Sequence, residues 1–244
     1  MVPEPTQSAN PVARPLVIIP TYNEAEGIAA VLDRTLSVCG RLEVLVVDDA
    51  SPDGTAARVR AQPAYGQRVH LLERGGKQGL GSAYRAGFAW ADERGFDAVI
   101  EMDADLSHDP ADIPRLLAAL ESGADAAIGS RYIGGVRVIN WPMRRLLLST
   151  SATTFARIVT RLPLTDATSG FKALRMDALR RLDRQALQAQ GYGFQIELHH
   201  ALWRSGARLV EVPIIFTERR EGQTKMNTSI AIEAFLRVLQ LSLK

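Results

Sequence analysis

Short apolar runs alternate along the first half of the chain with segments whose apolar residues recur at helical spacing. Four runs rich in Val, Ile and Leu predict buried strands at residues 16–19, 42–47, 69–72 and 98–102. Helices are predicted between and after them, at residues 28–36, 55–60, 82–93 and 113–120. Strands and helices that alternate roughly every 25 to 30 residues are typical of repeated βαβ units. The pattern therefore predicts an α/β fold with a mostly parallel sheet flanked by helices.

The second half of the chain is predicted to be mainly helical. Helices are expected at residues 148–162, 176–187, 194–203 and 230–243. The apolar stripe in the first of them favours packing in the core, and flanking arginines with Trp141 leave an interfacial helix as the alternative. Residues 166–172 predict a turn, and residues 209–216 predict an edge strand that Pro213 interrupts. We expect a flexible tail at residues 1–14, one α/β domain at residues 15–225 and an amphipathic helix at residues 226–244.

Two carboxylates follow the fourth predicted strand directly. Asp103 and Asp105 are separated by one residue, so in an extended backbone their side chains point to the same side. Two like charges in this arrangement repel each other unless a cation lies between them. Mg2+ and Mn2+ take oxygen ligands and can bridge such a pair to phosphates. The pair suggests a metal site that holds a diphosphate; the alternative is a turn residue followed by a helix cap.

Polar side chains also follow the first two predicted strands. Tyr22 and Glu24 come after the first strand, and Asp48 and Asp49 end the second. Ligands of parallel α/β sheets bind beyond the carboxyl ends of the strands. Three polar strand ends at one edge of the sheet therefore favour a binding site. No G-x-G-x-x-G motif follows the first strand, which argues against a dinucleotide-binding fold.

Composition and charge limit the range of partners. The 244 residues are 46% hydrophobic and carry a net charge of +2, which argues against a nucleic-acid partner. No apolar stretch reaches the roughly 18 residues that a transmembrane helix needs. Residues 126–165 contain six arginines and no acidic residue. Because arginine pairs with phosphate through two hydrogen bonds, this window suggests a phosphate-binding surface; a solvated basic face is the alternative.

Several motifs together resemble the family 2 inverting glycosyltransferases, which have the GT-A fold, and more narrowly the polyprenol (dolichol) phosphate mannose synthases. The motifs lie at residues 20–24, 47–55, 79–81, 102–108, 129–132, 140–141, 191–195 and 212–213. The resemblance spans residues 15–243. It implies a Rossmann-like GT-A glycosyltransferase domain at residues 15–225. It also implies GDP-mannose as donor, a polyprenyl phosphate as acceptor, and Mg2+ or Mn2+ as cofactor.

The resemblance assigns roles to individual residues. The family's guanosine contacts match Pro20, Tyr22, Glu24, Val47 and Asp49. Its metal and diphosphate contacts match Asp103, Ala104 and Asp105, and its acceptor-phosphate contacts match Arg131, Arg145 and Ser149. A mobile lid at residues 217–225 would bring Arg219 and Lys225 onto the donor phosphates. The expected catalytic residues are Asp103, Asp105 and Arg131. Ser107 stands where some relatives carry a glutamine that touches the metal.

A phosphate nucleophile would simplify the chemistry of transfer. A phosphate monoester has a second pKa of about 6, so it is largely dianionic near neutral pH and needs no strong general base. Attack opposite the leaving group would invert the sugar C1. Such an enzyme would lie peripherally at the cytoplasmic face of a membrane, where a membrane-anchoring partner protein or domain could hold it.

Three other functions fit parts of the sequence. A polyprenyl-phosphate hexosyltransferase that uses a UDP-sugar such as UDP-glucose would share the fold and the mechanism. A catalytically silent module would bind GDP or lipid phosphate without transfer. A nucleotidyltransferase would release pyrophosphate in place of GDP.

Overall fold

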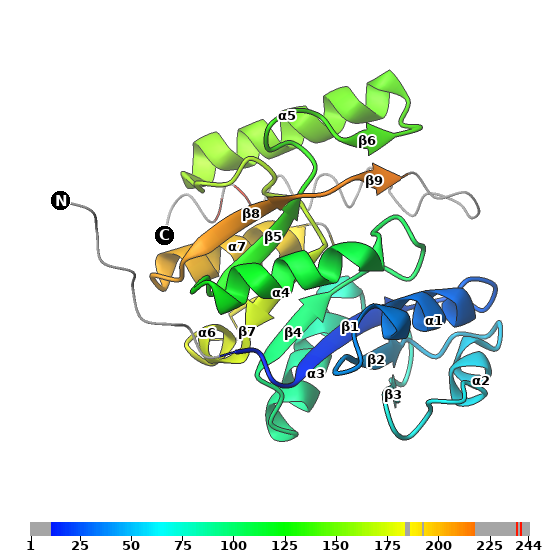
Figure 1. Cartoon of the computed structure of the whole chain (residues 1–244). Coiled ribbons are helices and arrows are strands. Elements are labelled where there is room, and N and C mark those ends of the chain that lie inside the picture. The colour runs from blue at the N-terminus through cyan, green and yellow to red at the C-terminus, as the bar shows by residue number, and fades with distance from the viewer. Residues whose placement is uncertain (1–10, 184–185, 192, 218–237, 239, 241–244) are drawn as a thin grey trace.

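Seven strands form the central sheet of the protein, in the order β3-β2-β1-β4-β7-β5-β8 (Figure 1). The computed structural model describes residues 11–183, 186–191, 193–217, 238 and 240. The strands are β1 Pro15–Thr21, β2 Glu43–Asp48, β3 Val69–Glu73, β4 Ala98–Glu101, β5 Ala126–Ser130, β7 Lys172–Arg175 and β8 Leu209–Pro213. Within this sheet, β7 runs antiparallel to both of its neighbours, and the other pairings are parallel. A second, two-stranded sheet pairs β6 Val138–Ile139 with β9 Phe216–Thr217.

Helices cover both faces of the central sheet. They are α1 Ile28–Val38, α2 Thr55–Arg60, α3 Leu80–Glu93, η1 Pro110–Asp112, α4 Ile113–Glu121, α5 Met143–Thr160, α6 Met176–Arg180 and α7 Gly193–Arg204. Successive residues of β1 point to opposite faces: Val17 and Ile19 pack with α1 and α4, whereas Leu16 and Ile18 pack with α3 and α7. This alternation in a buried strand explains why its sequence is a continuous apolar run. The α/β fold with a mostly parallel sheet is therefore confirmed.

The elements predicted in the first half of the chain are present with small shifts at their ends. The predicted edge strand in the second half is also present, since β8 lies at the end of the sheet and stops at Pro213. Two strands of the central sheet, β5 and β7, were not predicted, and neither was the short strand β6. Residues 166–172 were expected to be a turn, but Lys172 already begins β7. Strands β5 and β7 are only four or five residues long, and Lys172 does not fit an apolar pattern.

The helix predicted at residues 176–187 is wrong in its length, because α6 ends at Arg180. The described residues that follow, 181–183 and 186–191, are not helical, and some of them pack beside α3. Leu187 and Ala189 are buried in the same core layer as α3. The Arg85 side chain of α3 donates to the Leu187 carbonyl at 2.6 Å, and the Gly81 N–H donates to the Gln190 carbonyl at 3.1 Å. These tertiary contacts override the local helical pattern.

The prediction that the apolar stripe of α5 packs in the core is also wrong in part. Leu148 is 54% exposed and Ala152 is exposed, whereas the inward face of α5 carries Thr153, Ala156 and Thr160. Phe155 and Val159 of the stripe do pack partly against the body. Other large apolar residues of α5, including Leu148, face outward. None of the described helices combines the length and the apolar character that a membrane span requires.

The predicted terminal segments are described only in part. Residues 1–10 of the tail lie outside the described residues, but Val12 is buried and the backbone N–H groups of Ala13 and Arg14 donate to the Asp97 carboxylate. Most of the predicted C-terminal helix at residues 226–244 also lies outside them. Val238 is described and buried, in a small apolar cluster that includes Ala156 of α5 and Ile196 of α7.

Candidate active site

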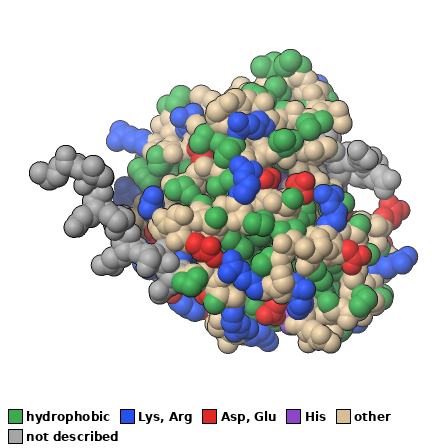
Figure 2. Space-filling view, viewed as in Figure 1, with side chains coloured by type: hydrophobic (Ala, Val, Ile, Leu, Met, Phe, Trp, Pro, Cys, Tyr) green, Lys and Arg blue, Asp and Glu red, His purple; other side chains and the backbone are tan. Residues whose placement is uncertain are grey.

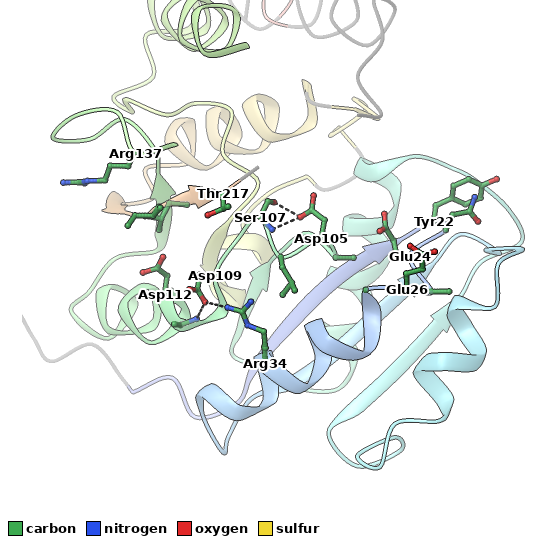
Figure 3. A pocket seen from close by; sticks show the side chains of 18 of the residues that line it. Tyr22, Glu24, Glu26, Arg34, Asp105, Ser107, Asp109, Asp112, Arg137 and Thr217 are labelled. Atoms are coloured by element: carbon green, nitrogen blue, oxygen red, sulfur yellow. Dashed lines mark hydrogen bonds and ion pairs between the residues drawn. The ribbon is translucent and has the colours of Figure 1, made fainter. Parts of the chain in front are cut away.

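A cleft of about 1450 Å³ opens at the carboxyl edge of the central sheet (Figure 3). Residues 22–27, which follow β1, line one side of it. Residues 104–107, which follow β4, lie in the middle, and Arg137 and Thr217 lie on the other side. The cleft therefore lies where the sequence predicts a binding site, beyond the carboxyl ends of β1 and β4.

The loop after β1 is fixed by hydrogen bonds that its backbone N–H groups donate to side chains of the turn after β2 and of the first residue of α2. Asn23 adopts a positive φ of 61°, and its N–H donates to the Ser51 hydroxyl at 3.0 Å. The Glu24 N–H donates to the Thr55 hydroxyl, and the Ala25 N–H donates to Asp53, both at 3.0 Å. Tyr22 and Glu24 thereby face the cleft, and the Lys77 ammonium lies 4.5 Å from the centre of the Tyr22 ring. This corner offers an aromatic ring, a carboxylate and a cation to a ligand.

Three other residues matched to guanosine contacts do not line the cleft directly. Pro20 is half-buried at the end of β1, and Val47 is fully buried in β2, between β1 and β3. Asp49 is paired with the Arg74 guanidinium and accepts from the Gln78 N–H at 2.9 Å. The Asp49 carboxylate therefore holds the glycine-bearing loop that leads into α3.

The acidic turn after β4 is closed by its own side chains. Asp105 accepts from the Ser107 N–H at 3.0 Å and from the Ser107 hydroxyl at 2.6 Å. Leu106 takes a positive φ of 58°, which lets the chain reverse between them. Ala104 and Asp105 line the cleft, and the Asp103 side chain is 39% exposed beside it. The turn thus presents both carboxylates at one end of β4.

The chemistry of this pair fits Mg2+ or Mn2+. Mg2+ is commonly held by one or two carboxylates and completes its coordination with phosphate oxygens and water. Among the described residues, no group of three or more His, Cys, Asp or Glu is arranged to hold a metal ion. Asp103 and Asp105 would therefore hold the ion together with the substrate's phosphates, not as a complete protein cage.

His108 lies behind the acidic turn, and no role was predicted for it beyond its place in the motif at residues 102–108. The ring is 3% exposed and lies between the rings of Phe171 and Phe216. Burial lowers the pKa of His108 to about 4, so the ring is neutral at physiological pH. The Asp103 N–H donates to its Nδ1 at 3.3 Å.

Arg131 is held by a residue that the sequence did not single out. Its guanidinium binds both oxygens of Asp166 at 2.7 Å, and its backbone N–H donates to the same carboxylate at 3.0 Å. Burial alone would raise the pKa of Asp166, but the Arg131 charge holds that pKa below its usual value. Asp166 lies directly after the acid-free window, so only its position next to the arginines could have pointed to the pair. Since Asp166 offsets the Arg131 charge, Arg131 alone supplies little net positive charge.

Tyr132 lies beside two of the predicted acceptor-phosphate residues, Arg131 and Ser149. The Tyr132 hydroxyl donates to Ser149 at 2.8 Å, and the Arg131 guanidinium carbon lies 5.2 Å from the centre of the Tyr132 ring. Arg145 belongs to α5, as Ser149 does. The two lid residues, Arg219 and Lys225, lie outside the described residues.

A fully buried ion pair lies beneath the acidic turn. The Lys172 ammonium contacts Glu101 at 3.0 Å and the Gln195 side-chain oxygen, and the Gln195 amide donates to Glu101 at 2.9 Å. Desolvation raises the pKa of Glu101 and lowers that of Lys172, while each charge opposes the shift of the other. The pair joins β4 to β7 two residues before Asp103.

Comparison with solved structures defines the class of the protein. Glucosyl-3-phosphoglycerate synthase from Mycobacterium tuberculosis, in complex with Mn2+, UDP and glucosyl-3-phosphoglycerate, has a similar fold, with a TM-score of 0.73 at 20% sequence identity. The similarity covers 94% of this chain and 80% of that one. The fold is therefore the GT-A fold of glycosyltransferases, as the sequence predicts.

Comparison with known sequences gives the family. Residues 16–183 match glycosyl transferase family 2. The chain is 45% identical to polyprenol monophosphomannose synthase of Mycolicibacterium smegmatis, over 99% of this chain and 91% of the other. It is 46% identical to undecaprenyl-phosphate mannosyltransferase of Micrococcus luteus, over 94% of each chain. The chain belongs to glycosyl transferase family 2, and its resemblance to polyprenol phosphate mannose synthases is confirmed.

Proposed function

We propose that this protein transfers mannose from GDP-mannose to a polyprenyl phosphate and inverts the sugar C1. The observation that carries the proposal is the identity of 45% and 46%, over nearly the full chain, to two enzymes named for mannose transfer to polyprenol or undecaprenyl phosphate. The cleft supports it, because an acidic turn suited to a metal-bound diphosphate lies on the same sheet edge as Arg131.

The donor would occupy the side of the cleft formed by the loops after β1 and β4. Tyr22 and Glu24 would contact the guanosine, with Pro20, Val47 and Asp49 behind them. Asp103, Ala104 and Asp105 would orient the diphosphate. A bound Mg2+ or Mn2+ ion would supply positive charge that stabilises the GDP leaving group. Arg219 and Lys225 would add contacts to the donor phosphates.

The acceptor phosphate would be held by Arg131, Arg145 and Ser149. A phosphate oxygen forms the new bond to C1, and the bond from C1 to the diphosphate breaks with its electron pair leaving on GDP. The dianionic nucleophile carries no proton that must be removed, so no general base takes part. Because Asp166 offsets the Arg131 charge, we assign most of the compensating positive charge to Arg145, Arg219 and Lys225.

The outward face of α5 would rest on the membrane that holds the acceptor. Its exposed large apolar residues are Met143 (68%), Leu147 (60%), Leu148 (54%) and Ile158 (73%). Arg144 and Arg157 are exposed on the same helix and would favour anionic lipid. Figure 2 shows hydrophobic side chains at the top of the molecule, where Figure 1 places α5, with Lys and Arg side chains near them. The enzyme would act peripherally, at the cytoplasmic face, with an anchoring partner protein or domain.

Changing two of these residues tests the membrane contact. Leu147→Gln combined with Leu148→Gln is expected to weaken binding to anionic lipid vesicles about 10-fold or more, because each leucine loses its burial in lipid. Vesicle cosedimentation measures the effect. Tyr65→Gln removes an exposed aromatic side chain that lies far from α5 in the chain and serves as the control. Equal binding of all three proteins would contradict the contact.

Transfer from labelled sugar nucleotides to a short polyprenyl phosphate tests the function itself. Label from GDP-mannose is expected to enter the organic phase, and EDTA is expected to abolish the transfer. Transfer from UDP-glucose alone would show that the assigned donor is wrong. Binding of GDP-mannose without transfer would favour a binding module.

A further inference from the structure

We infer that His108 is a positioning residue, which fixes the orientation of Asp103 at the donor site through a hydrogen bond to the Asp103 backbone. This inference rests on the proposed function, because the orientation of Asp103 matters for holding a metal-bound diphosphate. It concerns a residue that neither contacts the cleft directly nor belongs to the predicted site.

The hydrogen bond closes the acidic turn on itself. The Asp103 N–H donates to His108 Nδ1 at 3.3 Å, and the same nitrogen lies 3.8 Å from an Asp103 carboxylate oxygen. Because Nδ1 accepts, the ring proton must be on Nε2. Inside this loop, Asp105 accepts two hydrogen bonds from Ser107. The Asp105 carboxylate is therefore held by an inner closure through Ser107, and the Asp103 backbone by an outer closure through His108.

Two distant segments hold the His108 ring in place. Phe171, at the entry to β7, stacks on the ring with centroids 5.0 Å apart and planes 14° apart. Phe216 in β9 meets the ring edge to face at 5.3 Å and 77°. The neighbouring Thr217 N–H also donates to the Ser107 carbonyl at 3.3 Å. A ring held from two sides cannot tilt, so its Nδ1 gives the Asp103 backbone a fixed point of attachment.

Two substitutions can separate the packing of the His108 ring in the aromatic slot formed by Phe171 and Phe216 from its hydrogen bond to Asp103. His108→Phe fills the slot with a ring of similar size but offers no acceptor to the Asp103 N–H. His108→Asn places an amide oxygen near the position of Nδ1 but leaves part of the slot empty. If His108 acts only by packing, the phenylalanine variant should keep Mn2+ affinity and slow Asp103 exchange better than the asparagine variant. If His108 positions Asp103, the asparagine variant should keep them better.

The test measures three quantities for the wild-type protein and both variants. They are the melting temperature, the amide hydrogen exchange of Asp103 without metal, and the affinity for Mn2+ in the presence of GDP. We expect His108→Phe to weaken Mn2+ binding about 10- to 100-fold and to speed Asp103 exchange about 10-fold or more. We expect His108→Asn to keep both values within about threefold of the wild type, although its melting temperature is the lower of the two.

The inference would be overturned if Mn2+ affinity and Asp103 exchange followed the melting temperature across the two variants, since packing would then explain the whole effect. A separate result would count against the proposed function: a wild-type protein that binds no Mn2+ in the presence of GDP. The exchange of the Asp103 amide needs no ligand. Slow exchange in the wild type and in His108→Asn, together with fast exchange in His108→Phe, therefore supports the positioning role whether or not the proposed function holds.

Discussion

Asp105→Asn is expected to transfer mannose at least about 100-fold more slowly than the wild type, at an unchanged melting temperature. The substitution removes a negative charge from the side chain of the acidic turn that lines the cleft, so a bound divalent ion would lose one of the two carboxylates proposed to hold it. The asparagine oxygen can still accept from the Ser107 N–H and hydroxyl, so the turn should keep its shape. Initial rates at saturating Mn2+ and thermal unfolding measure the two effects.

Asp112→Asn is the matched control for this experiment. It removes the same charge from a carboxylate that lines the same cleft but is paired with Arg115 at 2.5 Å. We expect its rate to stay within about threefold of the wild type, as for a surface ion pair of small energetic value. If both variants lost activity to the same degree, the general negative potential of the cleft would matter, and Asp105 would have no specific role.

Lys172→Met should cost about 3–5 kcal/mol of the free energy of unfolding, because it leaves the Glu101 carboxylate buried without its cation. Both side chains of this pair are fully buried, and methionine has nearly the length of lysine without its charge. A loss of this size is a large fraction of the roughly 5–15 kcal/mol that keeps a typical domain folded. Urea unfolding at pH 7 measures it.

Combining Lys172→Met with Glu101→Gln should recover most of that stability, since the glutamine removes the buried charge and still accepts from Gln195. The single variant should also become less unstable as the pH falls below 7. Desolvation raises the pKa of Glu101 in the folded protein above its value in the unfolded chain. As the pH falls, the folded state therefore binds a proton before the unfolded state does, and the free energy of unfolding rises. A pH-independent cost that the second substitution does not reduce would point to lost packing in place of an unpaired charge.

The part of the fold that was predicted correctly depends on local pattern. Strands β1 and β2 are runs of β-branched and aliphatic residues buried on both faces, and α2 begins and ends where the sequence indicates. β7 was missed because its first residue is a lysine, whose burial depends on Glu101, 71 residues earlier in the chain. The outward-facing apolar side chains of α5 were misread as core because periodicity shows that a helix has an apolar face but not what covers it.

In the candidate site too, residues next to a predicted strand could be recognised from the sequence, whereas their partners from distant parts of the chain could not. Tyr22 and the acidic turn were expected at this edge of the sheet because each lies just beyond an apolar run that predicts a strand. Tyr22 and Asp105 do line the cleft, while their roles stay predictions. The partners that orient the site come from other segments of the chain: Asp166 for Arg131, and Phe171 and Phe216 for His108. Such pairs are set by the order of strands in the sheet, and a single sequence carries no direct signal for that order.

The antiparallel strand β7 also determines when the open edge of β4 can be covered as the ribosome makes the protein. Strands β1 to β4 pair with one another, so this half of the sheet can form early, but one edge of β4 stays open until β7 is made. β4 ends at Glu101 and β7 begins at Lys172, so about 70 residues are synthesised while an apolar strand edge is exposed to other chains. The strand that closes this edge also delivers Lys172 to Glu101 and Phe171 to His108. Covering the edge of β4 and bringing the first of these supports to the acidic turn are therefore coupled in folding.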